Sequence, residues 1–231
     1  MQRHHRTSPP MFVLAASLTL LAACSSSNST APGANAAAIV AVSASNVLVG
    51  TVGQDLATPV SIKVVDASGA PVAGAMVSWA IESGGGSISI TSLPTDSLGI
   101  ASVDWTLGTV AGTDSLKASV NGLTSLVLGA TANPDAVASL VKVSGDGQTI
   151  ASGSTAQFVV KAVDQYGNAV PGVPVTWMAE TGGVLGTTTT VTGIDGIAQN
   201  TLAPDQSTTY DVLAEVQNDA AIETQFTAST A

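Results

Sequence analysis

Residues 65–79 read Val-Asp-Ala-Ser-Gly-Ala-Pro-Val-Ala-Gly-Ala-Met-Val-Ser-Trp, and residues 163–177 read Val-Asp-Gln-Tyr-Gly-Asn-Ala-Val-Pro-Gly-Val-Pro-Val-Thr-Trp. The two segments share several identical residues at a constant spacing of 98, among them Asp66 and Asp164, Gly69 and Gly167, Val72 and Val170, Gly74 and Gly172, Val77 and Val175, and Trp79 and Trp177. A period of that length corresponds to one small domain. The chain is therefore predicted to contain two tandem copies of one module.

Each copy has the pattern of a strand, a turn and a second strand. Val60, Ile62 and Val64 alternate with other residues, as in a half-buried strand. Asp66 and Gly69 are turn formers, and the apolar alternation resumes after Gly74. Both tryptophans fall on the apolar side of the alternation, so we expect them in the core.

The same strand and turn pattern extends over the whole of each module. We place the first module at residues 38–132 and the second at residues 133–231, each with seven or eight short strands, which is typical of a β-sandwich. A single strand is expected over 101–107 and a loop over 108–114. Residues 44–56 have only a loose pattern. No helix is expected in either module, so the fold class is all-β.

The first 23 residues have the features of a secretory signal: Arg3 and Arg6 precede an apolar run that ends in small residues. The sequence Leu21-Ala22-Ala23-Cys24 resembles the lipobox of bacterial lipoproteins. That resemblance implies a covalent lipid on Cys24, and Ser25 in place of Asp favours the outer membrane. Residues 24–37 lack charges and large apolar side chains, and we interpret them as the lipidated Cys and a flexible tether.

Charge restricts the partners of the chain. Beyond residue 23 there are four lysines against sixteen acidic residues, which give a side-chain charge of −12. This acidity argues against nucleic acid, because a binding surface for phosphates must be basic. It favours a soluble extracytoplasmic protein.

The repeated residues resemble the bacterial immunoglobulin-like group 1 domains of the invasin and intimin type. The shared pattern comprises the Asp, Gly, Gly and Trp positions above, then Gly84-Gly85, and then Thr95 with Gly99-Ile100-Ala101, with counterparts at 182–183, 192 and 196–198. The second copy departs from the family at Leu202-Ala203-Pro204-Asp205. The resemblance implies two immunoglobulin-like sandwiches without an inter-sheet disulfide, acting as spacer or adhesive modules.

Enzymatic chemistry is disfavoured by the residue types present. The chain beyond residue 23 has no His and no Cys except Cys24, so the usual nucleophilic triads and zinc sites are excluded. Carboxylate pairs remain as an alternative, namely Asp66 with Glu82 and Asp164 with Glu180. Because they recur in both modules, turn capping explains them more simply.

Two ligand hypotheses remain open. Calcium requires oxygen ligands, and two sets of loop aspartates offer them: Asp66, Asp96 and Asp114, and Asp164, Asp195 and Asp205. Carbohydrate requires exposed aromatic rings, and only Tyr166 lies in a turn. Tyr210, at the start of a late strand, is expected to form a tyrosine corner.

The sequence therefore predicts a non-enzymatic, lipid-anchored protein of a bacterial cell envelope, without cofactors other than its covalent lipid. It would act as a spacer or in adhesion, facing the periplasm or the cell exterior. Its expected partners are the membrane, through the lipid, and a protein at the cell surface or in the envelope. The alternative is a lipoprotein that binds a carbohydrate or a protein.

Overall fold

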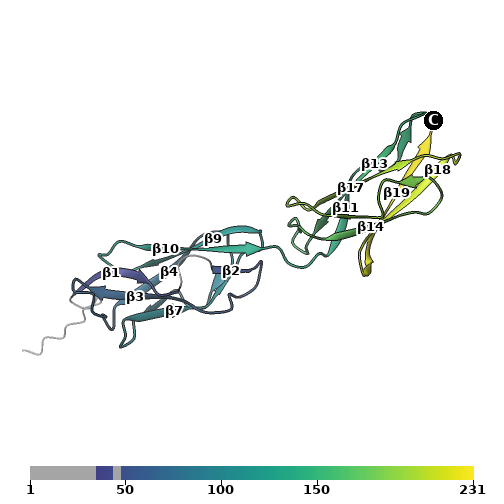
Figure 1. Ribbon diagram of the computed structural model, residues 1–231. Coiled ribbons are helices and arrows are strands. Elements are labelled where there is room, and N and C mark those ends of the chain that lie inside the picture. Colours follow the sequence, from purple (N-terminus) through teal and green to yellow (C-terminus); the bar gives the residue numbers. More distant parts are fainter. Residues whose placement is uncertain (1–34, 44–47) are drawn as a thin grey trace, which may run out of the picture. The chain divides into compact units, whose positions relative to one another are not determined.

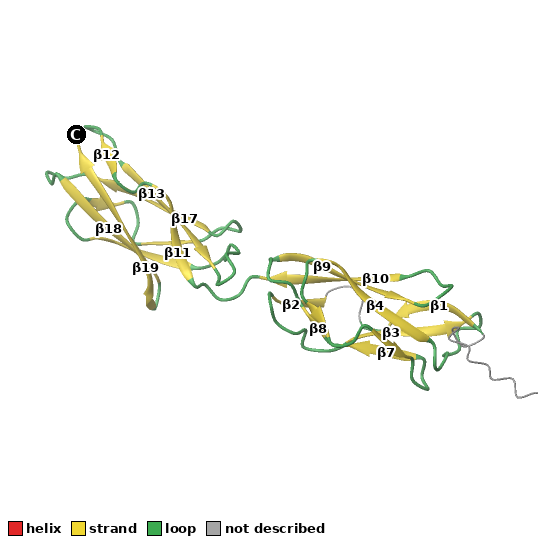
Figure 2. Ribbon diagram, turned by 180° about the vertical axis from the view of Figure 1, so that it is seen from behind, coloured by secondary structure: helices red, strands yellow, loops and turns green. Residues whose placement is uncertain are grey.

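The computed structural model describes residues 35–43 and 48–231. The predicted signal peptide, Cys24 and most of the predicted tether lie outside these ranges. All of the regular secondary structure in these ranges is β-strand, so the all-β expectation is confirmed (Figure 2). No described segment forms a helix with the length and apolar character needed to cross a bilayer.

The described residues of the first module form ten strands, several of which are labelled in Figure 1. They are β1 (Ala36–Ala41), β2 (Leu48–Thr51), β3 (Val60–Asp66), β4 (Met76–Ser83), β5 (Ser87–Ile88), β6 (Ser92–Pro94), β7 (Ile100–Val103), β8 (Trp105–Thr106), β9 (Gly112–Ser119) and β10 (Leu126–Asn133). One sheet has the order β1-β3-β7, and the other has the order β2-β10-β9-β4-β6. The short strands β5 and β8 pair separately.

The second module repeats this plan. Its strands are β11 (Ser139–Ser144), β12 (Gln148–Ile150), β13 (Ala156–Val163), β14 (Pro174–Ala179), β15 (Val184–Leu185), β16 (Thr189–Val191), β17 (Ile197–Ala203), β18 (Thr209–Val216) and β19 (Asp219–Thr230). One sheet has the order β11-β13-β17-β15, and the other has the order β12-β19-β18-β14-β16. The β-sandwich expectation is confirmed for both modules.

Each module buries its own core between its two sheets. Trp79 and Trp177 are 3% and 1% exposed, as the alternation predicted. They lie at the same place in the register, since Trp79 is opposite Ala118 and Trp177 is opposite Ala214. In the second module Phe226 packs against Phe158, with ring centroids 5.1 Å apart, and stacks near Trp177.

Three sequence-based expectations about strands need correction. The strand expected over 101–107 is divided at Asp104, because β7 pairs with β3 whereas β8 pairs with β5. The loop expected over 108–114 ends earlier, since β9 begins at Gly112 and pairs with β10 there. The loosely patterned residues 44–56 contain β2, which runs parallel to β10.

Candidate functional site

The repeated aspartate of the first module organises its own turn. Asp66 Oδ1 accepts hydrogen bonds from Ser68 N (2.8 Å), Ser68 Oγ (2.7 Å) and Ala70 N (3.0 Å). These bonds, the Ser68 hydroxyl first, lower the pKa of the Asp66 carboxyl. Gly69 completes the turn with a φ of +84°, in the left-handed region that favours glycine.

The aspartate of the second module does the same with more partners. Asp164 Oδ1 accepts from Tyr166 N (2.9 Å) and Asn168 N (2.8 Å), and Oδ2 accepts from Asp135 N (3.0 Å) and Asn168 Nδ2 (2.9 Å). Burial raises the pKa of this carboxyl, but the hydrogen bonds together outweigh that effect, so the pKa is lowered. Gly167 has a φ of +87°. Both aspartates are turn caps.

The glutamates of the proposed acid pairs have other partners. Glu82 Oε1 is 3.2 Å from Lys117 Nζ. Glu180 Oε2 accepts a hydrogen bond from Gln225 Nε2 (2.7 Å). Nothing in these contacts joins either glutamate to its aspartate as a catalytic pair would require.

The aspartates proposed for calcium also cap separate turns. Asp96 Oδ1 accepts from Leu98 N and Ile100 N, both at 2.8 Å, and Asp195 Oδ1 accepts from Ile197 N (3.0 Å). Residues 35–43 and 48–231 contain no group of three or more His, Cys, Asp or Glu side chains placed to hold a metal ion. The structure therefore does not bring either set of three together.

Buried threonines fasten the repeated turn to the neighbouring strand in both modules. Thr95 Oγ1 accepts from Ala75 N (2.9 Å) and donates to the Val72 carbonyl (2.7 Å). Thr192 makes the equivalent pair of bonds with Val173 N and the Val170 carbonyl. Next to them, Gly74 and Gly172 have φ of +74° and +75° and donate to the carbonyls of the same threonines. The threonines and glycines of the repeated pattern are therefore structural.

Tyr210 forms the predicted corner in the second module. Its hydroxyl donates to the Ser207 carbonyl (2.6 Å). The neighbouring Asp205 accepts from Gly183 N (3.0 Å) and Ser207 N (2.7 Å), and these bonds lower the pKa of its carboxyl to about 2. Burial, followed by the charge of Asp205, raises the pKa of the Tyr210 phenol.

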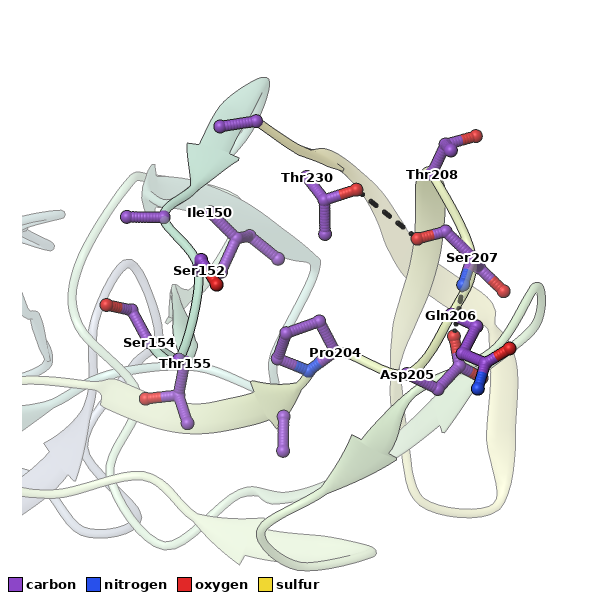
Figure 3. A pocket seen from close by; sticks show the side chains of 14 residues that line it. Ile150, Ser152, Ser154, Thr155, Pro204, Asp205, Gln206, Ser207, Thr208 and Thr230 are labelled. Carbon is purple, nitrogen blue, oxygen red and sulfur yellow. Dashed lines mark hydrogen bonds between the residues drawn. The ribbon is translucent and has the colours of Figure 1, made fainter.

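Beside this corner lies a pocket of about 480 Å³ that the sequence analysis did not identify (Figure 3). It lies between the segments 150–155 and 203–208 and the end of β19 at Thr230. Most of its labelled side chains carry a hydroxyl, including Ser152, Ser154 and Thr208. The concentration of Ser and Thr in two loops was the available sequence signal, but only the fold brings the loops together.

Asp114 occupies the place of Tyr210 in the first module, since each lies four residues before the alanine opposite the repeated Trp. Asp114 is 1% exposed, and its Oδ2 accepts from Gly108 N (2.7 Å). Its Oδ1 has no hydrogen-bond partner among the described residues. A tyrosine corner in one copy is thus replaced by a buried carboxylate in the other.

The aromatic side chains confirm the expected division between core and surface. Trp105 and Tyr210 are at most 1% exposed, whereas Tyr166 is 43% exposed. Tyr166 is the one aromatic ring among the exposed large hydrophobic side chains in the described residues. One exposed ring is a poor platform for a sugar.

Family comparison explains why both copies share these turns. The bacterial Ig-like domain (group 1) family matches residues 39–133 and 139–229. The chain belongs to this family. The predicted immunoglobulin-like fold and the resemblance to the invasin and intimin type are confirmed.

Two of the proteins to which this chain is similar are named as adhesins, YeeJ and FdeC. The inverse autotransporter adhesin YeeJ of Escherichia coli is 31% identical over 173 residues, which cover 71% of this chain but only 7% of YeeJ. InvD of Yersinia pseudotuberculosis aligns with a TM-score of 0.53 at 21% identity, over 83% of this chain and 56% of InvD. The Escherichia coli adhesin FdeC aligns with a TM-score of 0.50 at 18% identity, over 84% and 63%. The two structural alignments show the fold alone.

Proposed function

We propose that this chain is a non-enzymatic, lipid-anchored protein of a bacterial cell envelope, whose two modules serve as a spacer or in adhesion. The observation that carries the proposal is the family match over both modules, together with the likeness to an adhesin. The repeated residues support it, because Asp66, Asp164, Thr95 and Thr192 are all committed to turns or strand connections.

The anchor is a separate part of the proposal and rests on Leu21-Ala22-Ala23-Cys24. A diacylglyceryl group on Cys24, usually with a further acyl chain, would hold the protein firmly, because one acyl chain alone binds a membrane only marginally. The outer membrane is the proposed location, on the side of the periplasm or of the cell exterior. In this arrangement the lipid is the contact with the membrane, and the modules are the contact with a protein partner.

Protease treatment of intact cells tests the location. Degradation of the native protein in intact cells, with release of a Cys24→Ser variant from the membrane fraction, is the result expected for a lipid-anchored surface protein. Protection until the outer membrane is opened would place the modules in the periplasm and exclude host or cell–cell adhesion. A Cys24→Ser variant that remains in the membrane fraction would refute the anchor.

A second candidate function is ligand binding by the second module, and the hydroxyl-rich pocket near Ser152 and Thr208 favours it. Hydroxyl and carboxylate groups are suited to bind the hydroxyls of a carbohydrate. NMR spectra recorded with a panel of oligosaccharides test this function. Shift changes centred on residues 151–155 and 203–208 would support it, and unchanged spectra at millimolar oligosaccharide would exclude it. A response centred on Tyr166 that is lost in Tyr166→Ala would place the site in the 164–168 turn instead.

A further inference from the structure

Two lysines occupy the same place on the outer faces of the two modules. Lys63 lies on β3 between Val40 of β1 and Ile100 of β7. Lys161 lies on β13 between Val141 of β11 and Ile197 of β17. In each module, three neighbouring strands therefore place a Val, a Lys and an Ile side by side in that order. The three residues lie far apart in the sequence.

These two lysines also lack acidic partners. Lys117 pairs with Glu82 at 3.2 Å, and Lys142 pairs with Asp146 at 2.6 Å. Every Asp and Glu of the chain lies within the described residues, and none of them pairs with Lys63 or Lys161. Among residues 35–43 and 48–231, which include all sixteen acidic residues, the lysines without an ion pair are confined to one repeated position.

In the second module the lysine lies on an apolar surface. Val160 and Ala162 of β13 are buried, so Lys161 and Val159 point outward from the sheet. Val141 and Val143 of the neighbouring strand β11 are 47% and 52% exposed. We call this surface, formed by Val141, Val159, Lys161 and Ile197, the lysine face.

The other sheet of the same module has an outer surface of opposite charge. Asp211 and Glu215 lie on β18, and Glu223 lies directly opposite Glu215 on β19. Like charges directly opposite each other in a sheet are destabilising. Their carboxylates make no ion pair or hydrogen bond among the described residues. Next to them, Leu213 lies opposite Met178, which is 40% exposed. We call this surface the acidic face.

The first module provides an internal comparison. The register places Lys117 where the second module has Leu213, and Ser119 where it has Glu215. Lys117 neutralises Glu82 there. The first module thus has a counterpart of the lysine face around Lys63, whereas it has no counterpart of the acidic face.

We propose that the lysine face of one copy docks on the acidic face of the second module of another copy. Both faces combine β-branched or other apolar side chains with charge, and the charges are of opposite sign. The lysine of the other copy would offset part of the repulsion between the acidic carboxylates within one copy. Because the two faces lie on opposite sides of one sandwich, the contact is heterologous and can continue from copy to copy.

The net negative charge of the chain does not exclude this contact. Charges on exposed surfaces are screened over about 8 Å at physiological ionic strength, so repulsion between distant parts of two copies is weak. Lysine and carboxylate groups in direct contact across the faces would be screened much less. Charge complementarity at the contact would therefore determine which surfaces meet.

Cross-linking of two full-length copies expressed in one cell tests the contact. One copy carries Gln199→Cys, opposite Val159 of the lysine face, and the other carries Gln225→Cys, opposite Leu213 of the acidic face. A short bis-maleimide joins the two cysteines. We expect a cross-linked product between the two copies. Lys161→Glu in the first copy should lower its yield about fivefold or more, as a loss of about 1 kcal/mol would.

Charge exchange distinguishes docking from a loss of folding. Glu215→Lys with Glu223→Lys in the second copy should also lower the yield, and combining these changes with Lys161→Glu in the first copy should restore it. Lys117→Glu, which makes the same change of charge away from both faces, should leave the yield unchanged. Absence of the product, a yield that Lys161→Glu does not change, or failure of the exchanged pair to restore it would each overturn the proposal.

Discussion

Two glycines with the same backbone conformation should respond very differently to alanine. Gly69 and Gly86 both have a φ of +84°. A Cβ added to Gly69 meets no atom within 4 Å. A Cβ added to Gly86 would lie 2.8 Å from the carbonyl carbon of Leu107 and 2.9 Å from Gly108 N, with the Thr106 carbonyl oxygen closer still.

The expected magnitudes follow from these distances. Alanine in the left-handed region costs about 1–2 kcal/mol, and this cost is common to both variants. Gly86→Ala adds a clash with backbone atoms, and overpacking of this kind costs about 1–3 kcal/mol or more. We therefore expect Gly69→Ala to lower the free energy of unfolding by about 1–2 kcal/mol, and Gly86→Ala to lower it by about 2–5 kcal/mol.

Urea unfolding followed by tryptophan fluorescence measures both values. In a Trp177→Phe background, Trp79 and Trp105 make the fluorescence a report on the first module alone. Equal losses for Gly69→Ala and Gly86→Ala would refute the reasoning, because they would show that the backbone around Thr106 yields without cost. A larger loss for Gly69→Ala would refute it as well.

Three further predictions concern the polar contacts of the site. Asp114→Ala should lower the free energy of unfolding by about 1–3 kcal/mol, since Gly108 N loses its buried acceptor. Asp114→Asn retains an acceptor and should lower the free energy of unfolding by less. Equal losses for the two variants in urea unfolding would argue against this role of the carboxylate. The folded-state pKa of Asp205, about 2, lies below its ordinary value of 3.8, so the stability it contributes is present above about pH 4 and is lost as the pH falls toward 2. The difference in urea midpoint between the native protein and Asp205→Asn should accordingly shrink over that range, and a constant difference would contradict the assignment. Thr192→Val leaves a buried N–H and a carbonyl unpaired and should lower the free energy of unfolding by about 1–3 kcal/mol. Thr201 is exposed, so Thr201→Val should change the free energy of unfolding by less than about 0.5 kcal/mol. Calorimetry that finds the two variants equally stable would refute the role given to Thr192.

Much of the fold was accessible from the sequence because the signals are local. The alternation around Trp79 and Trp177 predicted two buried strands, and the spacing of 98 residues predicted two modules. Asp66 and Asp164 were predicted as turn caps, since a short carboxylate bonds backbone N–H groups a few residues away. The corner at Tyr210 was predicted from its place at the start of a late strand, and its partner, the Ser207 carbonyl, is only three residues away.

Other features depend on contacts between distant residues, and the sequence did not predict them. Strands β2 and β12 are short and weakly patterned, and they form by pairing in parallel with β10 and β19, which lie far along the chain. The division at Asp104 arises because the two halves of the expected strand pair with different neighbours. Hydrophobic alternation carries no information on which strand will be the partner.

The lysine face and the acidic face also depend on contacts between distant residues. By itself, the sequence determined the two modules, their turns and the core positions, because each depends on neighbours within a few residues. Only the tertiary structure placed Val141, Lys161 and Ile197 side by side, and Glu215 opposite Glu223. Strand register alone decides which outward side chains share a face, and register is established when the whole sandwich assembles.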